Sequence, residues 1–215
     1  MAISNNTTGL RTGVCTSTTR PTAPYEGQMI YETDTDLTYV YNGSSWQQVS
    51  GGTAVGNSGL VFVKSQTIGS AVSSVTVSDA FSATYDNYLI QVSGGAVSTQ
   101  NELRLQMSGT TSGYYYQLIL GTWSATIAGE GSKIATEWLY TGMGATNGLV
   151  MNCQVYLPYL ATRTRIVAPY FGFVGDVGHV HGQLDNATQY TGFVIKTSTG
   201  TMTGGTIRVY GYRNS

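Results

Sequence analysis

The sequence carries little charge, which limits what the protein can bind. Only 10% of its residues are Asp, Glu, Lys or Arg, against roughly 25% in an average domain. The ten basic and eleven acidic residues give a net charge of −1 and form no basic cluster. Proteins that bind nucleic acid need such a cluster, so no nucleic-acid partner is predicted. Ser, Thr, Asn, Gly and Tyr fill the polar positions, which favours surfaces that pack against other protein or bind sugars.

Long apolar runs are also missing. No segment approaches the roughly 18 consecutive apolar residues of a membrane-spanning helix, so no membrane partner is expected. The first residues, Met-Ala-Ile-Ser-Asn-Asn, contain neither a basic segment nor an apolar stretch, and no signal peptide is predicted. The only two cysteines, Cys15 and Cys153, are expected to be free thiols in a reducing compartment.

Sequence motifs for catalysis are absent. The chain has no Gly-x-Ser-x-Gly, no phosphate-cradling Gly-x-x-x-x-Gly-Lys and no Cys with a motif-level His partner. Gly142-Met143-Gly144 lacks the helix of a dinucleotide site and is interpreted as a turn between strands. A carboxylate pair for glycoside hydrolysis stays open, but no spacing nominates one. The chain is therefore predicted to be no enzyme and to hold no cofactor.

Short β-type runs fill the chain from Leu60 onward, and glycine-rich turns separate them. The clearest alternation places Leu103, Leu105 and Met107 on an inward face. This pattern predicts an all-β fold with a jelly-roll-like antiparallel β-sandwich over residues 60–215, although a galectin-like or immunoglobulin-like strand order stays open. The expected strands are Leu60–Lys64, Val72–Val77, Asn87–Ser93, Glu102–Met107, Tyr114–Gly121, Ile134–Tyr140, Leu149–Tyr156, Arg165–Phe173, Tyr190–Thr197 and Thr206–Tyr212.

Residues 24–50 predict a smaller module. Three short aromatic and β-branched runs are separated by Thr-Asp-Thr-Asp and Asn-Gly-Ser, which are turn sequences, so we expect a three-stranded meander. The two-residue period of strands predicts one apolar face. A sheet this small needs a partner for that face, and the predicted docking and trimerisation residues are Tyr25, Met29, Tyr31, Leu37, Tyr39, Tyr41 and Trp46.

The same stretch resembles a module of tailed-phage virion proteins, especially those of marine phages and cyanophages. The match rests on Arg20, Pro21, Pro24, Gly27, Tyr31, Thr33, Asp34, Tyr39, Tyr41, Gly43 and Trp46. The segment Gly204–Arg213 is similar to the closing strand of that group. The resemblance implies an N-terminal arm that docks into the particle or wraps a trimer axis.

Residues 1–23 are rich in Thr, Ser and Asn and show no strand or helix period. They are predicted to form an extended arm that becomes ordered on a neighbouring subunit, with Ile3, Leu10 and Val14 as anchors. A disordered tail is the alternative. Residues 51–59 are interpreted as a Gly/Ser linker between the meander and the sandwich.

Two further sets of side chains are candidates for ligand binding. His179 and His181 form a His-x-His pair that would share one face of a strand, but no third metal ligand is evident, although Asp176 and Asp185 flank the pair. No metal site is therefore predicted, and the two histidines are interpreted as surface or subunit-contact residues. Exposed rings are the second set, because they stack on sugars or on a neighbouring subunit. The candidates are Tyr115, Trp123 and Trp138, with core packing as the simpler account.

The resemblance implies a homotrimeric structural protein of the virion that is assembled in the host cytoplasm. We expect a capsid cement or decoration protein that stabilises the head by docking its arm and meander on the major capsid protein or other virion proteins. The alternative is a short tail fibre or baseplate appendage whose β-domain binds host-surface polysaccharide. The short chain, which has no fibrous shaft, favours the head.

Overall fold

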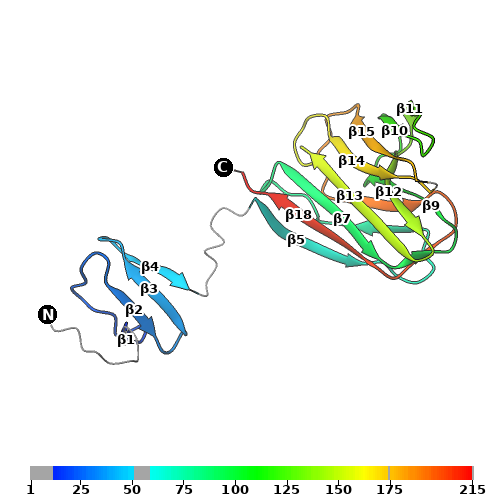
Figure 1. Cartoon of the computed structure of the whole chain (residues 1–215). Helices are drawn as coiled ribbons and strands as arrows, with labels where there is room; N and C mark the ends of the chain where they lie inside the picture. Colours follow the sequence, from blue (N-terminus) through cyan, green and yellow to red (C-terminus); the bar gives the residue numbers. More distant parts are fainter. Residues whose placement is uncertain (1–11, 51–58, 174, 215) are drawn as a thin grey trace. The chain divides into compact units, whose positions relative to one another are not determined.

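The computed structural model describes residues 12–50, 59–173 and 175–214 and divides the chain into two compact units, residues 1–58 and 59–215. Figure 1 shows both units as strands joined by turns, and no helix occurs among the described residues. The all-β fold class that the sequence predicts is thus confirmed. Nothing in this part of the chain is a helix that could cross a membrane.

The small unit is a four-stranded sheet in the order β1-β2-β3-β4. The strands β2 (Met29–Glu32), β3 (Leu37–Tyr41) and β4 (Trp46–Ser50) form the predicted antiparallel meander. A fourth strand, β1 (Gly13–Cys15), pairs in parallel with β2. The prediction of an arm over residues 1–23 is wrong for this stretch, and Val14 is a strand residue of the sheet. A three-residue strand is too short to show a period, and Ile3 and Leu10 lie outside the described residues.

The strand register corrects the prediction of a single apolar face. Ile30 lies opposite Tyr39, and Glu32 lies opposite Leu37. Directly opposed residues share a face, so Leu37 and Tyr39 of β3 lie on the same face as Ile30 and Glu32. Met29 and Tyr31 lie on the other face.

The large unit holds the remaining strands, and its main sheet has twelve of them. Every strand pair in this sheet is antiparallel, both between strands that follow each other in sequence and between strands far apart in it. The strands are β5 (Leu60–Thr67), β6 (Ser74–Val77), β7 (Asn87–Gly94), β8 (Ala96–Val97), β9 (Asn101–Met107), β10 (Tyr114–Gly121), β11 (Ile127–Ala135), β12 (Trp138–Ala145), β13 (Gly148–Tyr156), β14 (Arg165–Phe171), β15 (Val177–Leu184), β16 (Phe193–Thr197), β17 (Met202–Thr203) and β18 (Thr206–Tyr212).

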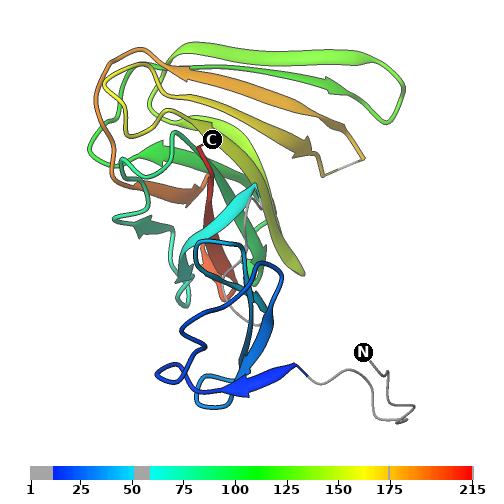
Figure 2. The ribbon, with the colours of Figure 1, turned by 90° about the vertical axis from the view of Figure 1, so that its left-hand side faces the viewer.

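The strand β13 divides this sheet. One of its edges pairs with β7 along its length, and β7 continues through β18 to β5. The other edge is shared, because the first half of β13 pairs with β12 and the second half with β14. From there the order runs β12-β9-β16-β6 in one direction and β14-β15-β10-β11 in the other. In Figure 2 the latter four strands lie side by side as one layer.

The core is filled by alternate residues of the facing strands. Leu103, Leu105 and Met107 of β9 are fully buried, as the alternation predicts. They belong to one apolar cluster with residues of β7, β13, β16 and β18. Two large aromatic residues, Trp138 and Phe193, are also fully buried in that cluster.

Two predictions about the segment around residue 140 are wrong. The expected strand Ile134–Tyr140 is two strands, because the chain leaves β11 at Ala135 and enters β12 at Trp138. Gly142 and Gly144 form no turn and lie within β12. A Cβ at Gly142 would lie 2.6 Å from the Val150 carbonyl oxygen, so glycine is needed here for close approach to the neighbouring strand.

Candidate functional site

One face of the small sheet is closed by the chain's own segment before β2. The Arg20 guanidinium forms an ion pair with Glu32, whose side chain is 0% exposed. It also lies over the Tyr39 ring, 4.4 Å from the centroid. Asp34 holds the same segment, since its carboxylate accepts hydrogen bonds from the Ser17 backbone N–H at 2.9 Å and hydroxyl at 2.6 Å.

Four of the residues that the sequence predicts to dock on a partner lie at this face, and one of them, Tyr39, contacts Arg20. Leu37, Tyr39, Tyr41 and Trp46 are half-buried on or beside the closed face. The Tyr41 and Trp46 rings contact each other with centroids 5.4 Å apart.

Acid is expected to destabilise the small sheet. The hydrogen bond from Arg20 lowers the pKa of Glu32, and the hydrogen bonds from Ser17 lower that of Asp34. A carboxyl whose pKa is lower in the folded state stabilises the fold above its unfolded pKa, near 4.5 for Glu, and loses this contribution as the pH falls through the folded value. The stability of the sheet should therefore be level at neutral pH and fall below about pH 4.5.

The Ile30 methyl resonances, followed through urea titrations at several pH values, measure this effect. In the variant Glu32→Gln, the fall in the stability of the sheet below about pH 4.5 should be smaller. If stability falls as steeply with acid in this variant as in the natural chain, the assignment of the effect to Glu32 is wrong.

The other face of the small sheet stays open. Val14 is 67% exposed and Met29 45%, and the half-buried Tyr31 lies beside them because it pairs with Val14. Val40 pairs with Met29 and extends the row. We call Val14, Met29, Tyr31 and Val40 the open face. Tyr25, which the sequence also predicts to dock, is 70% exposed in the loop before β2.

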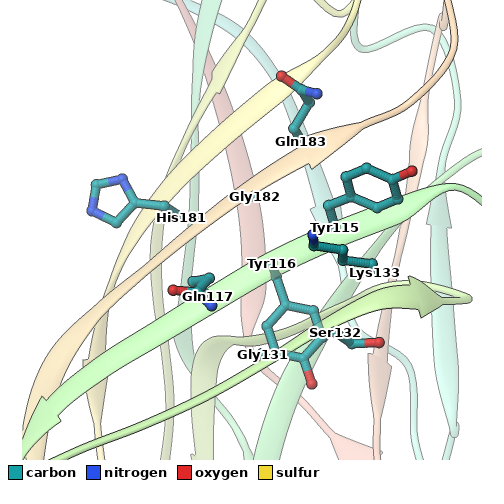
Figure 3. A pocket seen from close by; sticks show the side chains of 9 residues that line it. All are labelled: Tyr115, Tyr116, Gln117, Gly131, Ser132, Lys133, His181, Gly182 and Gln183. Carbon is teal, nitrogen blue, oxygen red and sulfur yellow. The ribbon is translucent and has the colours of Figure 1, made fainter.

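The large unit carries a pocket on its layer β11-β10-β15-β14. Its volume is about 450 Å³, within the range of roughly 300–1,000 Å³ of small-molecule sites. Figure 3 shows Gln117 beside His181, with Tyr115 beside Lys133 and with Gln183 further along β15. The lining residues are Tyr115, Tyr116, Gln117, Gly131, Ser132, Lys133, His181, Gly182 and Gln183.

Strand register explains why these side chains gather. Across β10 and β15, Tyr115 lies opposite Gln183, and Gln117 lies opposite His181. All four therefore share the outward face of the layer. On the neighbouring strand β11 a Cβ at Gly131 would lie 2.8 Å from the Tyr116 carbonyl oxygen, so glycine is needed here for the close approach of β11 to β10.

The Tyr115 ring is held in place. Its hydroxyl donates a hydrogen bond to the Asp185 Oδ2 atom at 3.0 Å, and the Oδ1 atom of Asp185 lies 2.5 Å from the Arg163 guanidinium. The hydrogen bond to Asp185 raises the pKa of Tyr115. The ring is thus presented as a neutral, fixed surface.

The other predicted ring positions are separate from this pocket. Trp138 is 0% exposed, so its prediction as an exposed ligand-binding ring is wrong. It packs in the core with its ring centroid 4.9 Å from that of Tyr114. Trp123 is 76% exposed, but it follows the far end of β10 from Tyr115.

The histidine pair and the cysteines offer no further chemistry. His179 and His181 are exposed on β15, and within the described residues no three His, Cys, Asp or Glu side chains gather as metal ligands. Both cysteines are free. Burial raises the pKa of the Cys153 thiol, which suits an inert core residue.

Comparison with known proteins identifies no family. No protein-family model and no curated protein matches the chain. Among solved structures, "Structure of infectious bursal disease virus Gt strain" has a chain with 8% sequence identity and a TM-score of 0.12. That similarity covers 80% of this chain and 45% of the viral one, and at such a score it carries no argument about fold or function.

Proposed function

We propose that the protein is a structural subunit of a tailed-phage virion that docks through its small unit, as a cement or decoration protein does on a capsid. The open face carries this proposal. The segment around Arg20 closes one side of the small sheet, yet Val14 and Met29 on the other side stay exposed. An apolar face on so small a sheet favours burial against other protein. The sequence resemblance to virion arms supplies the particle as the partner, with a homotrimer as the assembled form.

The proposal predicts that a charge on the open face prevents docking. Burial of a Val or Met side chain contributes roughly 1.5–3 kcal/mol, so Met29→Asp should lower incorporation into particles by about tenfold or more. Virions are purified from cells that supply the variant in place of the natural chain, and its band is quantified against the major capsid protein.

The matched control is Ile134→Asp. Ile134 is 92% exposed on β11 of the large unit, so the same new charge there should leave incorporation unchanged. Normal incorporation of Met29→Asp would overturn docking through the open face. Absence of the natural chain from virions would overturn the virion proposal itself.

A short tail fibre or baseplate appendage is the second candidate, and the pocket on the large unit favours it. A protein that only cements a shell has no need of a ligand pocket, whereas an appendage that contacts the host surface does. The same gel distinguishes the two candidates by copy number. A ratio near a simple lattice stoichiometry supports the head, and a few copies per particle support the tail.

A further inference from the structure

The cations around the pocket are unusual for this chain. The whole sequence has ten Lys and Arg residues. Lys133 lines the pocket, and Arg165 lies directly opposite Gln183 on the adjacent strand β14, with its side chain on the same outward face. Within the described residues neither Lys133 nor Arg165 has a carboxylate at ion-pair distance, and no Asp or Glu lines the pocket.

Two acids lie near the pocket, and both have partners. Glu130 lies opposite the buried Leu118, on the inward side of the layer, and accepts hydrogen bonds from the hydroxyls of Tyr116 and Tyr140. Asp185 is paired with Arg163 and accepts the hydrogen bond of Tyr115. The outward face around the pocket therefore keeps an excess of positive charge from Lys133 and Arg165. In a protein with so few charges, such an excess favours an anionic ligand.

The uncharged lining groups indicate the rest of the ligand. Gln117 and Gln183 each offer an amide that donates and accepts, which matches hydroxyl groups. The fixed Tyr115 ring offers an apolar surface for stacking. Neighbouring hydroxyls, a C–H face and an anionic group occur together in acidic sugars.

We propose that this pocket binds an acidic saccharide. The C–H face of a sugar ring lies on Tyr115, hydroxyls bond to Gln117 and Gln183, and anionic groups of successive sugar units pair with Lys133 on one side and with Arg165 on the other. The anion is a carboxylate, as in a uronic acid, or a sulfate ester, since both offer charged oxygens to ammonium and guanidinium groups. The inference names the ligand class for the second candidate function, but it rests on the large unit alone and holds whichever part of the virion carries the protein.

The test is titration calorimetry on the full chain with defined oligosaccharides. The probes are an oligogalacturonate, a sulfated oligosaccharide of matched length and a neutral one. We expect an acidic probe to bind at least about tenfold more tightly than the neutral probe, because a charge-assisted contact contributes roughly 1.5–3 kcal/mol. The carboxylated and sulfated arms show which anion is preferred.

Variants connect the binding to the pocket. Lys133→Gln and Arg165→Gln should each weaken binding of the acidic probe by about threefold to tenfold without changing the neutral probe. Tyr115→Ala should remove binding, while Tyr115→Phe, which keeps the ring, should retain most of it. The controls Arg213→Gln and Trp123→Ala change an exposed cation and an exposed ring elsewhere and should have no effect.

Three results would overturn the proposal. The first is the absence of binding by either acidic probe at millimolar concentration. The second is equal affinity for the neutral probe, or for a single-stranded oligonucleotide of equal charge, which would show that the saccharide or its anion is not recognised. The third is unchanged affinity in folded Lys133→Gln and Tyr115→Ala proteins. Circular dichroism confirms the fold of each variant, and none of these measurements requires a virion.

Discussion

Replacement of Trp138 by alanine is expected to lower the free energy of unfolding of the large unit by about 3–5 kcal/mol. The side chain is 0% exposed. Its indole N–H donates a hydrogen bond to the Tyr115 carbonyl oxygen at 3.2 Å, and a Cβ at Gly182 would lie 2.5 Å from the indole nitrogen. Gly182 lies against the indole and has no side chain that could move into the cavity left by the substitution. Urea unfolding followed by far-ultraviolet circular dichroism measures the loss, which is large against a typical total of about 5–15 kcal/mol.

Trp123→Ala is the matched control. This ring is 76% exposed, so its removal should change the free energy of unfolding by no more than about 0.5 kcal/mol. Similar losses in the two variants would contradict the placement of Trp138 in the core. A folded Trp138→Ala protein with full stability would contradict it as well.

Replacement of Arg20 by alanine is expected to open the small sheet. It removes both the ion pair with Glu32 and the cation that lies over the Tyr39 ring. Glu32 has a fully buried side chain, and among the described residues it would keep the hydrogen bond from the Thr35 hydroxyl at 2.8 Å. A buried carboxylate without a cation disfavours the folded state. Amide hydrogen exchange across β2 and β3, read by mass spectrometry on the whole chain, should become faster by about tenfold or more.

Arg20→Lys tests whether the shape of the guanidinium matters. Lysine keeps the charge but lacks the planar group that both pairs with Glu32 and stacks on Tyr39, so exchange should be intermediate. Arg213→Ala, at an exposed site in the large unit, should leave exchange in β2 and β3 unchanged. Unaltered exchange in Arg20→Ala would show that the segment does not stabilise the sheet.

The strands that the sequence predicts well are those whose buried residues are large. In β9, apolar and polar residues alternate, and the observed burial of Leu103, Leu105 and Met107 follows the pattern. The strands Tyr114–Gly121 and Thr206–Tyr212 have the predicted bounds. Large apolar side chains at every second position are a signal that local sequence carries by itself.

The strands that are not predicted from the sequence have small residues at the inward positions, where large apolar residues would have indicated a strand. The inward positions of β15 include Gly178 and Gly182, and a Cβ at either would collide with the neighbouring strand or with Trp138. Glycine in a sequence usually indicates a turn, whereas these two glycines allow close contact with residues that are distant in sequence. The edge strand β11 is mostly exposed and shows no apolar alternation.

Candidate binding residues were predictable only in part. Tyr115 and His181 stand out because of their chemistry, and both line the pocket. Gln117, Lys133 and Gln183 are ordinary polar residues, and only the pairing of β10 with β11 and β15 brings them together. The prediction of a single apolar face on the small sheet is wrong for the same reason, since the faces of two strands can be matched only when their register is known.

The place of β18 in the sheet sets an order of events during synthesis. This strand lies between β5 and β7, the first and third strands of the large unit, although it is the last strand of that unit in sequence. The sheet cannot close until the ribosome has released Thr206–Tyr212, whereas the small sheet pairs only near neighbours in sequence and can fold much earlier. Non-local pairing of this kind slows folding. Until β18 has been synthesised, β5 and β7 of the nascent large unit lack the strand that pairs with both of them. We expect the large unit to depend on a chaperone during that interval.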